Sequence, residues 1–172
     1  MSIIEFQGKK PNIGKEVFLA PGSWVIGDVT LGDGATVWTG AVIRGDDNTV
    51  TIGARSTILE NCIVEAPTGN PVVIGEEVII SHGAIVHGAT VKDHALVGIG
   101  ATVLDGATVG EGAIIGASGL VAPGKEIPAN MLAIGIPAKP VREVREAERE
   151  NVDKEHSRTM EKAAVYKEIY SK

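Results

Sequence analysis

Aliphatic residues recur at every sixth position along most of this chain. The first run extends from Ile13 to Ile43, the next two begin at Ile52 and Ile74, and the last extends from Val91 to Ile127. Four residues after most of these aliphatics comes a small or β-branched side chain. An amphipathic helix needs a period of about 3.6 and a half-buried strand a period of about two, so neither element explains the pattern.

A period of six predicts short strands joined by turns, with three strands in a coil of about eighteen residues. The aliphatic side chains then point inward and stack roughly 4.8 Å apart, the spacing of neighbouring strands. About six such coils fit into the chain, enough to bury a continuous core. This is the hexapeptide repeat, which resembles the left-handed parallel β-helix, and the hand is implied by that resemblance alone. We therefore expect an all-β solenoid over residues 1–136.

The repeat is interrupted twice and then ends. Three extra residues fall in "RGDDNTV" after Ile43 and four in "EAPTGNP" after Val64, and we expect loops at both places. Beyond "GIPAKP" the sequence becomes highly charged and lacks both Gly and Pro. This change predicts a long helix that starts near Val141. We expect residues 137–172 to form a C-terminal helical unit that packs on the prism or on a neighbouring subunit.

Composition and charge narrow the range of partners. The formal net charge of −6 argues against a nucleic-acid surface, which needs a cationic footprint. The apolar run at the N-terminus is too short for a signal peptide or a membrane span. We therefore expect a cytoplasmic protein with no membrane partner. The single cysteine, Cys62, occupies an inward position of the repeat, so we expect a buried core residue and not a reactive thiol.

Polar residues gather in two outward columns. Because every third hexapeptide shares a face, Arg44, Glu65 and His87 should stack in successive coils, about 4.8 Å apart. On the preceding face, Glu60 and His82 should stack in the same way. Two histidines with nearby carboxylates form a ligand set that divalent metals accept.

The two columns belong to different faces, so His82 and His87 of one chain are poorly placed to share a metal. If three prisms pack side by side, His82 of one subunit can meet Glu65 and His87 of the next, which suggests a cyclic homotrimer with sites between subunits. Two roles remain open for Glu65, metal ligation and a cross-strand ion pair with Arg44. The histidines have an alternative as ordinary interface residues.

The segments "AVIRGDDNTVTIG", "ISHGAIVHGATV", "GIGATVLDGATVGEGAIIGA" and "GIPAKPVR" resemble the γ-class carbonic anhydrase family, which includes members labelled ferripyochelin-binding proteins. The resemblance implies a trimer with zinc, or iron in some members, held by three histidines at each subunit interface. It also implies reversible hydration of carbon dioxide to bicarbonate. On this chain it makes His82 and His87 metal ligands from adjacent subunits, and Arg44 and Asp46 an interface pair.

Two positions depart from the family pattern. The family's first histidine ligand falls at Glu65, and a glutamine that orients the hydroxide falls at Leu59, while the acidic residue beside it is present as the catalytic candidate Glu60. Two histidines and a glutamate are a known zinc set. The added negative charge should make bound water less acidic, so we expect weak or absent hydration. The alternatives are an acyltransferase that uses coenzyme A, with His82 or His87 as the base, and a non-catalytic trimeric scaffold.

Overall fold

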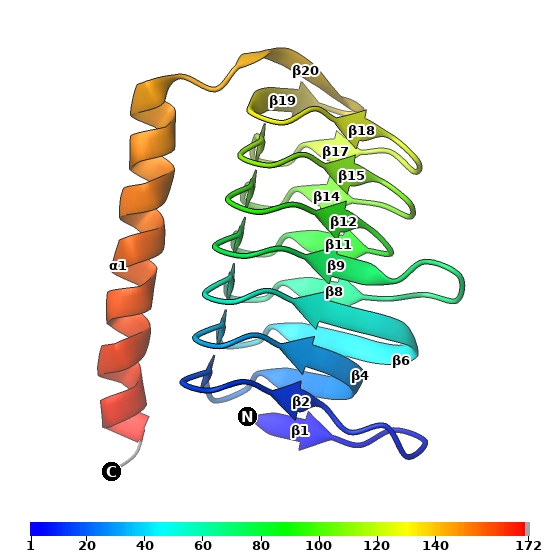
Figure 1. Cartoon of the computed structure of the whole chain (residues 1–172), viewed down its shortest axis with the longest axis vertical. Helices are drawn as coiled ribbons and strands as arrows, with labels where there is room; N and C mark the ends of the chain where they lie inside the picture. Colours follow the sequence, from blue (N-terminus) through cyan, green and yellow to red (C-terminus); the bar gives the residue numbers. More distant parts are fainter. Residues whose placement is uncertain (171–172) are drawn as a thin grey trace.

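The computed structural model describes residues 1–170 as a three-sided parallel β-solenoid with one long helix along its side (Figure 1). The strands stack in about seven coils with the left-handed path of hexapeptide-repeat proteins, so the predicted fold class is confirmed. The sequence period predicts about six coils. The additional coil comes from the two ends, where β1 and β19 extend the stack beyond the regular repeat.

The prism has three faces, which we name by what they carry. The His87 face contains β1 (Ser2–Ile4), the first parts of β4 (Trp24–Leu31) and β6 (Val42–Ile52), β8 (Ile63–Glu65), β11 (Ile85–His87), β14 (Thr102–Val103) and β17 (Leu120–Val121). The third face contains β2 (Asn12–Ile13), the second parts of β4 and β6, β9 (Val72–Ile74), β12 (Thr90–Val91), β15 (Thr108–Val109) and β18 (Glu126–Ile127). The helix-covered face contains β3 (Phe18–Leu19), β5 (Thr36–Val37), β7 (Thr57–Ile58), β10 (Ile79–Ile80), β13 (Leu96–Val97), β16 (Ile114–Ile115) and β19 (Met131–Gly135).

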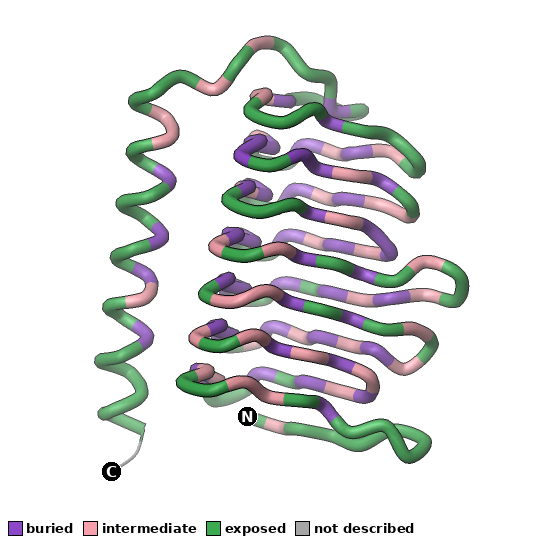
Figure 2. Tube along the Cα trace, in the orientation of Figure 1, coloured by how far each residue is buried: buried purple, intermediate pink, exposed green. Residues whose placement is uncertain are grey.

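The core consists of the residues that the six-residue period identifies. From Val25 to Ile127, each aliphatic residue of the series is at most 1% exposed (Figure 2). Ile13 and Leu19 are only half-buried, because the first coil has no full coil beneath it. Cys62 is fully buried among the small inward residues, as predicted. Burial of a Val or Ile side chain contributes about 1.5–3 kcal/mol, so the stacked aliphatics supply most of the favourable free energy of folding.

The two interruptions of the repeat have different structures. The residues after Val64 form a loop at 66–71 that projects from the prism, as expected (Figure 1). The residues after Ile43 do not form a loop, and this expectation was wrong. They belong to β6, which continues through a corner of the prism and pairs with β4 on both sides of a β-bulge. A bulge absorbs extra residues without ending a strand.

The C-terminal helix α1 spans Glu146–Tyr170, so the predicted start near Val141 was wrong. Before it, β20 (Ala138–Glu143) pairs antiparallel with β19 and covers the last coil of the solenoid. The open edge of that coil offers hydrogen-bond partners to the backbone N–H and C=O groups of β20. This pairing outweighs the helical propensity of the charged sequence. The N–H of Arg145 donates to the Glu148 carboxylate at 2.9 Å, and this cap marks the beginning of the helix.

Helix α1 runs back along the helix-covered face toward the N-terminal end (Figure 1). On this helix, the Arg149 guanidinium donates to the carbonyls of His94 and Gly112. The His156 imidazole lies 2.7 Å from the Arg55 carbonyl. The buried side chains of α1 are Val152, His156, Thr159 and Ala163. Polar side chains of the helix therefore bond the backbone at the prism corners, and small apolar side chains fill the space between them.

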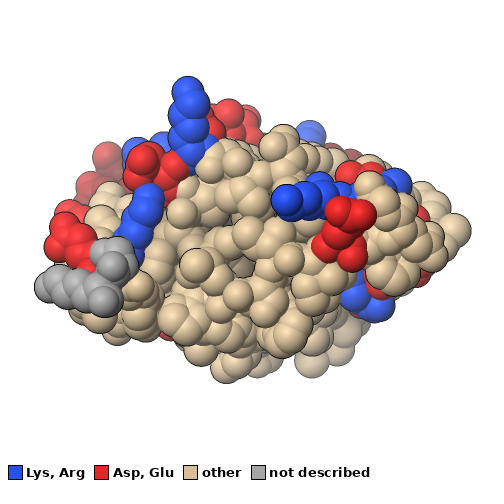
Figure 3. Space-filling view, turned by 90° about the horizontal axis from the view of Figure 1, so that it is seen from below, with Lys and Arg blue, Asp and Glu red and all other residues tan. Residues whose placement is uncertain are grey.

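Charged side chains lie mainly around the rim of the prism when it is seen from the N-terminal end (Figure 3). Between them, much of that end is uncharged, with Ile3, Ile4 and Phe6 partly exposed. Within residues 1–170, no helix is both long and apolar enough to cross a membrane.

Candidate metal centre

His82 lies at the corner where the helix-covered face turns into the His87 face. Gly83, with φ of +66°, makes the turn, and its N–H donates to the Glu60 carbonyl of the coil below at 2.8 Å. This stacking places His82 over Glu60, as the columns predict, with Nδ1 2.7 Å from Oε2. The two groups are close but are not aligned as a hydrogen bond, and this buried oxygen accepts none within residues 1–170. Glu60 therefore influences His82 through its charge.

The second column is also present. Arg44 pairs in register with Glu65, and Glu65 with His87. Within one chain the Glu65 carboxylate forms an ion pair with Arg44, while its Oε1 lies 4.0 Å from His87 Nε2. Arg44 also donates to Asp46 at 3.0 Å. The hydrogen bond that the Arg44 guanidinium donates to the Glu65 carboxylate raises the pKa of Arg44 above its ordinary value. The ion pair with Arg44, one of the two roles predicted for Glu65, is present, and metal ligation stays a prediction.

Asp105 is a site residue that the sequence reasoning missed. His87 Nδ1 lies 2.5 Å from Asp105 Oδ1 of the coil above, in hydrogen-bonding geometry. His87 follows the inward Val86 by one residue, whereas Asp105 follows Val103 by two, so the contact is diagonal and a search along straight columns does not find it. Diagonal neighbours on adjacent strands are still within reach of long side chains, and this spacing is the signal that could have identified Asp105.

A glycine maintains this contact. Gly88 follows His87 with φ of +57°, and a Cβ added to it would lie 2.7 Å from Asp105 Oδ1. Any larger residue would push the carboxylate away from the imidazole. The "HG" pairs at His82 and His87 therefore each combine a side chain of the site with the turn that positions it.

Both imidazoles direct Nδ1 toward a carboxylate. A neutral ring that donates from Nδ1 keeps the Nε2 lone pair available. Metal-ligating histidines nearly always donate their second ring nitrogen in this way, which fixes the tautomer and the ring orientation. For His87 the arrangement meets that requirement through Asp105, and for His82 the neighbouring Glu60 favours the same tautomer electrostatically.

One chain does not bring the two histidines together. His82 precedes β11 and His87 ends it, and extended residues advance about 3.3 Å each. Two nitrogens on one zinc ion lie within about 4 Å of each other, since each bond is about 2.0–2.1 Å. Consistent with this, no cluster of three or more His, Cys, Asp or Glu side chains suited to a metal exists within residues 1–170.

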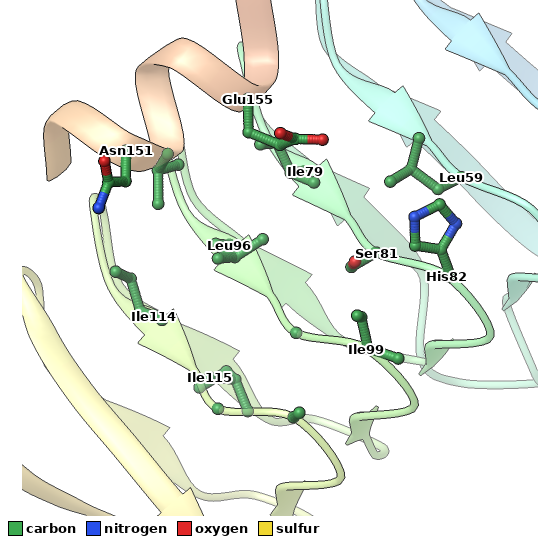
Figure 4. A pocket seen from close by; sticks show the side chains of 14 residues that line it. Leu59, Ile79, Ser81, His82, Leu96, Ile99, Ile114, Ile115, Asn151 and Glu155 are labelled. Atoms are coloured by element: carbon green, nitrogen blue, oxygen red, sulfur yellow. The ribbon is translucent and has the colours of Figure 1, made fainter. Parts of the chain in front are cut away.

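Leu59 and Cys62 flank Glu60 and contribute no polar group to the site. Leu59 is 4% exposed, and its side chain lines a cavity between the prism and α1 (Figure 4). The Cys62 thiol lies 3.0 Å from the Ser81 carbonyl, and burial raises its pKa to about 12. The thiol is therefore neutral at physiological pH and does not supply a metal ligand or a nucleophile.

Several known proteins with similar sequences are named carbonic anhydrases. The chain is 46% identical over 136 residues to a Methanocaldococcus jannaschii protein named as a probable carbonic anhydrase, covering 79% of this chain and 86% of that protein. It is 40% identical over 146 residues to the mitochondrial gamma carbonic anhydrase 1 of Arabidopsis thaliana, covering 81% of this chain and 53% of that longer protein.

A solved structure shares the fold almost end to end. A Bacillus cereus protein described as an acetyltransferase candidate superposes with a TM-score of 0.95 at 37% identity, covering 97% of each chain. No family model matches the sequence.

Proposed function

The chain belongs to the γ-class carbonic anhydrase family, and from this premise we propose that it is a homotrimer that holds a divalent metal between subunits. The proposed chemistry is reversible hydration of carbon dioxide to bicarbonate, weakened by Glu65 and Leu59. The observation that carries the proposal is that His82, in the turn before β11, and His87, at the end of β11, each direct Nδ1 toward a carboxylate.

A cyclic trimer completes the site. In a threefold assembly, the edge of the His87 face that carries His82 in each subunit lies against the edge that carries His87 in the next subunit. His82 of one subunit then meets His87 and Glu65 of its neighbour, and three equivalent centres form. Within one chain, His82 and His87 are too far apart to bind the same metal ion. This separation is what a site between subunits requires.

The surface of the His87 face supports this assembly. Trp24 is 42% and Ile63 43% exposed, and both lie in outward positions of this face. Contiguous apolar surface on a soluble protein commonly marks a contact. Asp46 Oδ1 on β6 is buried yet has no hydrogen-bond partner within residues 1–170. A buried, unpaired carboxylate oxygen is costly, and a donor from a neighbouring subunit would satisfy it.

The donor set suits zinc, with iron as the second candidate. His82, His87 and Glu65 would hold the metal, and a metal bound there would lower the pKa of a bound water, less so with Glu65 than with a third histidine. Asp105 orients His87, and the pair of Arg44 with Asp46 would help to organise the interface. Glu60 is the proposed group that accepts a proton beside His82.

Two features lower the proposed activity. Arg44 competes with a metal for the Glu65 carboxylate, because it forms an ion pair with it in the same column. Leu59 lies beside Glu60 and His82 in the wall of one cavity, and its aliphatic side chain offers no hydrogen bond to a bound water. Weak hydration activity is therefore the expected property of the native protein.

The test combines metal analysis with a carbon dioxide hydration assay on the wild type and Glu65→His. We expect weak activity in the wild type and an increase of at least about tenfold in the variant, because a neutral imidazole leaves more charge on the metal. Glu65→Ala is the matched variant for metal content. Loss of metal identifies Glu65 as a ligand, and retention assigns it to the ion pair with Arg44.

High hydration activity of the wild type would contradict the predicted weakening. Absence of stoichiometric metal after purification without chelators would favour a non-catalytic scaffold. Acyl transfer from coenzyme A is the second candidate, favoured by the similarity to the acetyltransferase candidate from Bacillus cereus. Acetyl-coenzyme A turnover with an amine acceptor would support it over hydration.

A further inference from the structure

A cavity of about 440 Å³ separates α1 from the helix-covered face (Figure 4). The prism side is aliphatic, and the helix side carries both apolar and polar groups. Its principal lining residues are Ile79, Leu96 and Ile114 from the strands and Asn151, Val152 and Glu155 from α1. Apolar cavities of this size with a few polar groups are the usual form of small-molecule sites.

A second cavity of about 200 Å³ adjoins the first. The two share Leu59, His82 and Glu155 in their walls. The second is more polar, and its lining adds Glu60, Trp38, Tyr166 and Lys162, among others. Together they form a space beneath α1 that is aliphatic toward the C-terminal coils and acidic and aromatic toward the N-terminal coils. We call the two parts the aliphatic chamber and the polar chamber.

The charge around the shared wall is negative. Glu155 extends from α1 over the space toward Leu59 and His82 (Figure 4), and its carboxylate has no side-chain partner within residues 1–170. Glu60 faces the same space from the prism. Lys162 is the single lysine or arginine in the lining, so the carboxylates exceed the cations by one.

The aromatic groups add a preference for cations. Trp38 is 6% exposed and stands edge-to-face against Tyr166, with ring centroids 5.7 Å apart. Ammonium groups bind favourably to the faces of Trp and Tyr rings, more so where water is excluded. Carboxylates and aromatic rings together form a lining that attracts an ammonium group and repels a carboxylate.

We propose that this two-chamber cavity binds an amphipathic primary amine, with its aliphatic chain in the aliphatic chamber and its ammonium group near Glu155 and Glu60. The aliphatic chamber crosses three stacked strands, β10, β13 and β16, and so extends about 10 Å along the prism, enough for an alkyl chain of roughly eight carbons. The cavity shares His82 and Glu60 with the proposed metal centre, whereas Glu65 and His87 line neither chamber, so amine binding needs no bound metal.

The experiment is isothermal titration calorimetry of the full-length protein with n-octylamine, octanoate and 1-octanol. We expect saturable binding of octylamine at least about tenfold tighter than that of octanoate, because the carboxylates oppose an anionic head group. Glu155→Gln should weaken octylamine binding about tenfold. Lys162→Met should tighten it, since a competing positive charge is removed.

Two further variants separate the cavity from general surface effects. Glu150→Gln removes an acidic side chain of α1 that pairs with Lys154 outside both chambers, and it should leave binding unchanged. Ala117→Trp places a large ring at the exposed rim of the aliphatic chamber and should abolish binding while the protein stays folded by circular dichroism. Absence of saturable octylamine binding, equal binding of octanoate, or insensitivity to Glu155→Gln would overturn the proposal.

Discussion

At the level of single residues, Asp105 determines the orientation of the His87 imidazole. Its carboxylate accepts from Nδ1 at 2.5 Å and leaves Nε2 free. Asp105→Asn should lower metal affinity about 10- to 100-fold, the usual cost of losing such a partner. A competition titration against a chelator of known affinity would measure the change.

The matched control for this variant is Asp153→Asn, which changes an exposed acidic residue on α1. It should leave metal affinity unaltered. Equal affinities of wild type and Asp105→Asn would show that the contact with His87 does not orient a metal ligand.

Cys62 provides a second test at this scale. Burial raises the pKa of its thiol to about 12, so the reactive thiolate is scarce in the folded protein at neutral pH. The native protein should react with a thiol reagent only after denaturation. Rapid stoichiometric labelling at pH 7 without loss of structure would contradict the buried position.

The residues that the sequence predicted correctly are those governed by the repeat. A strict period determines both which side chains enter the core and which stack in columns, so Glu60 beneath His82 and Glu65 beneath His87 could be placed by counting. Asp105 could not, because its contact crosses between columns. The close ion pair of Glu65 with Arg44 was one of two open alternatives, since register alone does not determine which neighbour a carboxylate prefers.

At the level of elements, the beginning of α1 depends on Glu148. The bidentate hydrogen bond from Arg142, and then the N–H of Arg145, lower the pKa of the Glu148 carboxyl from its ordinary value of 4.5 to about 2. Because the pKa in the folded state is depressed, this contribution to stability is fully present above about pH 4.5 and is lost as the pH falls toward about 2.

Glu148→Gln should therefore increase amide hydrogen exchange in the first turns of α1 at pH 7. The difference from wild type should shrink as the pH falls below about 4.5. Glu161→Gln, at an exposed position of the same helix, is the control and should not alter exchange there. A difference between Glu148→Gln and wild type that is independent of pH would contradict the assigned cause.

The boundary between solenoid and helix shows why element predictions failed at the C-terminus. The segment "VREVRE" has the composition of a helix, but the last coil exposes an unpaired strand edge. Pairing of β20 with that edge is a long-range effect that no local pattern reveals. The cavity beneath α1 was unpredictable for the same reason, because its walls lie far apart in the sequence.

At the level of the whole molecule, the central claim is that the metal centre lies between subunits. The three faces of the prism differ: α1 covers one, the third carries outward threonines in several strands, and the His87 face leaves Trp24 and Ile63 exposed. The face with the candidate ligands is thus also the face best suited to contact another copy.

Subunit mixing tests this claim most directly. His82→Ala and His87→Ala variants would be purified separately, unfolded, mixed in equal amounts and refolded together, and metal content and hydration activity measured. In a cyclic trimer, a site between two subunits is intact when a His87→Ala subunit provides His82 and its His82→Ala neighbour provides His87. Random mixing places each variant on the required side about half of the time, so about a quarter of the sites should return. Each variant refolded alone should bind no tightly held metal. No recovery of metal in the mixture would contradict a centre shared between subunits.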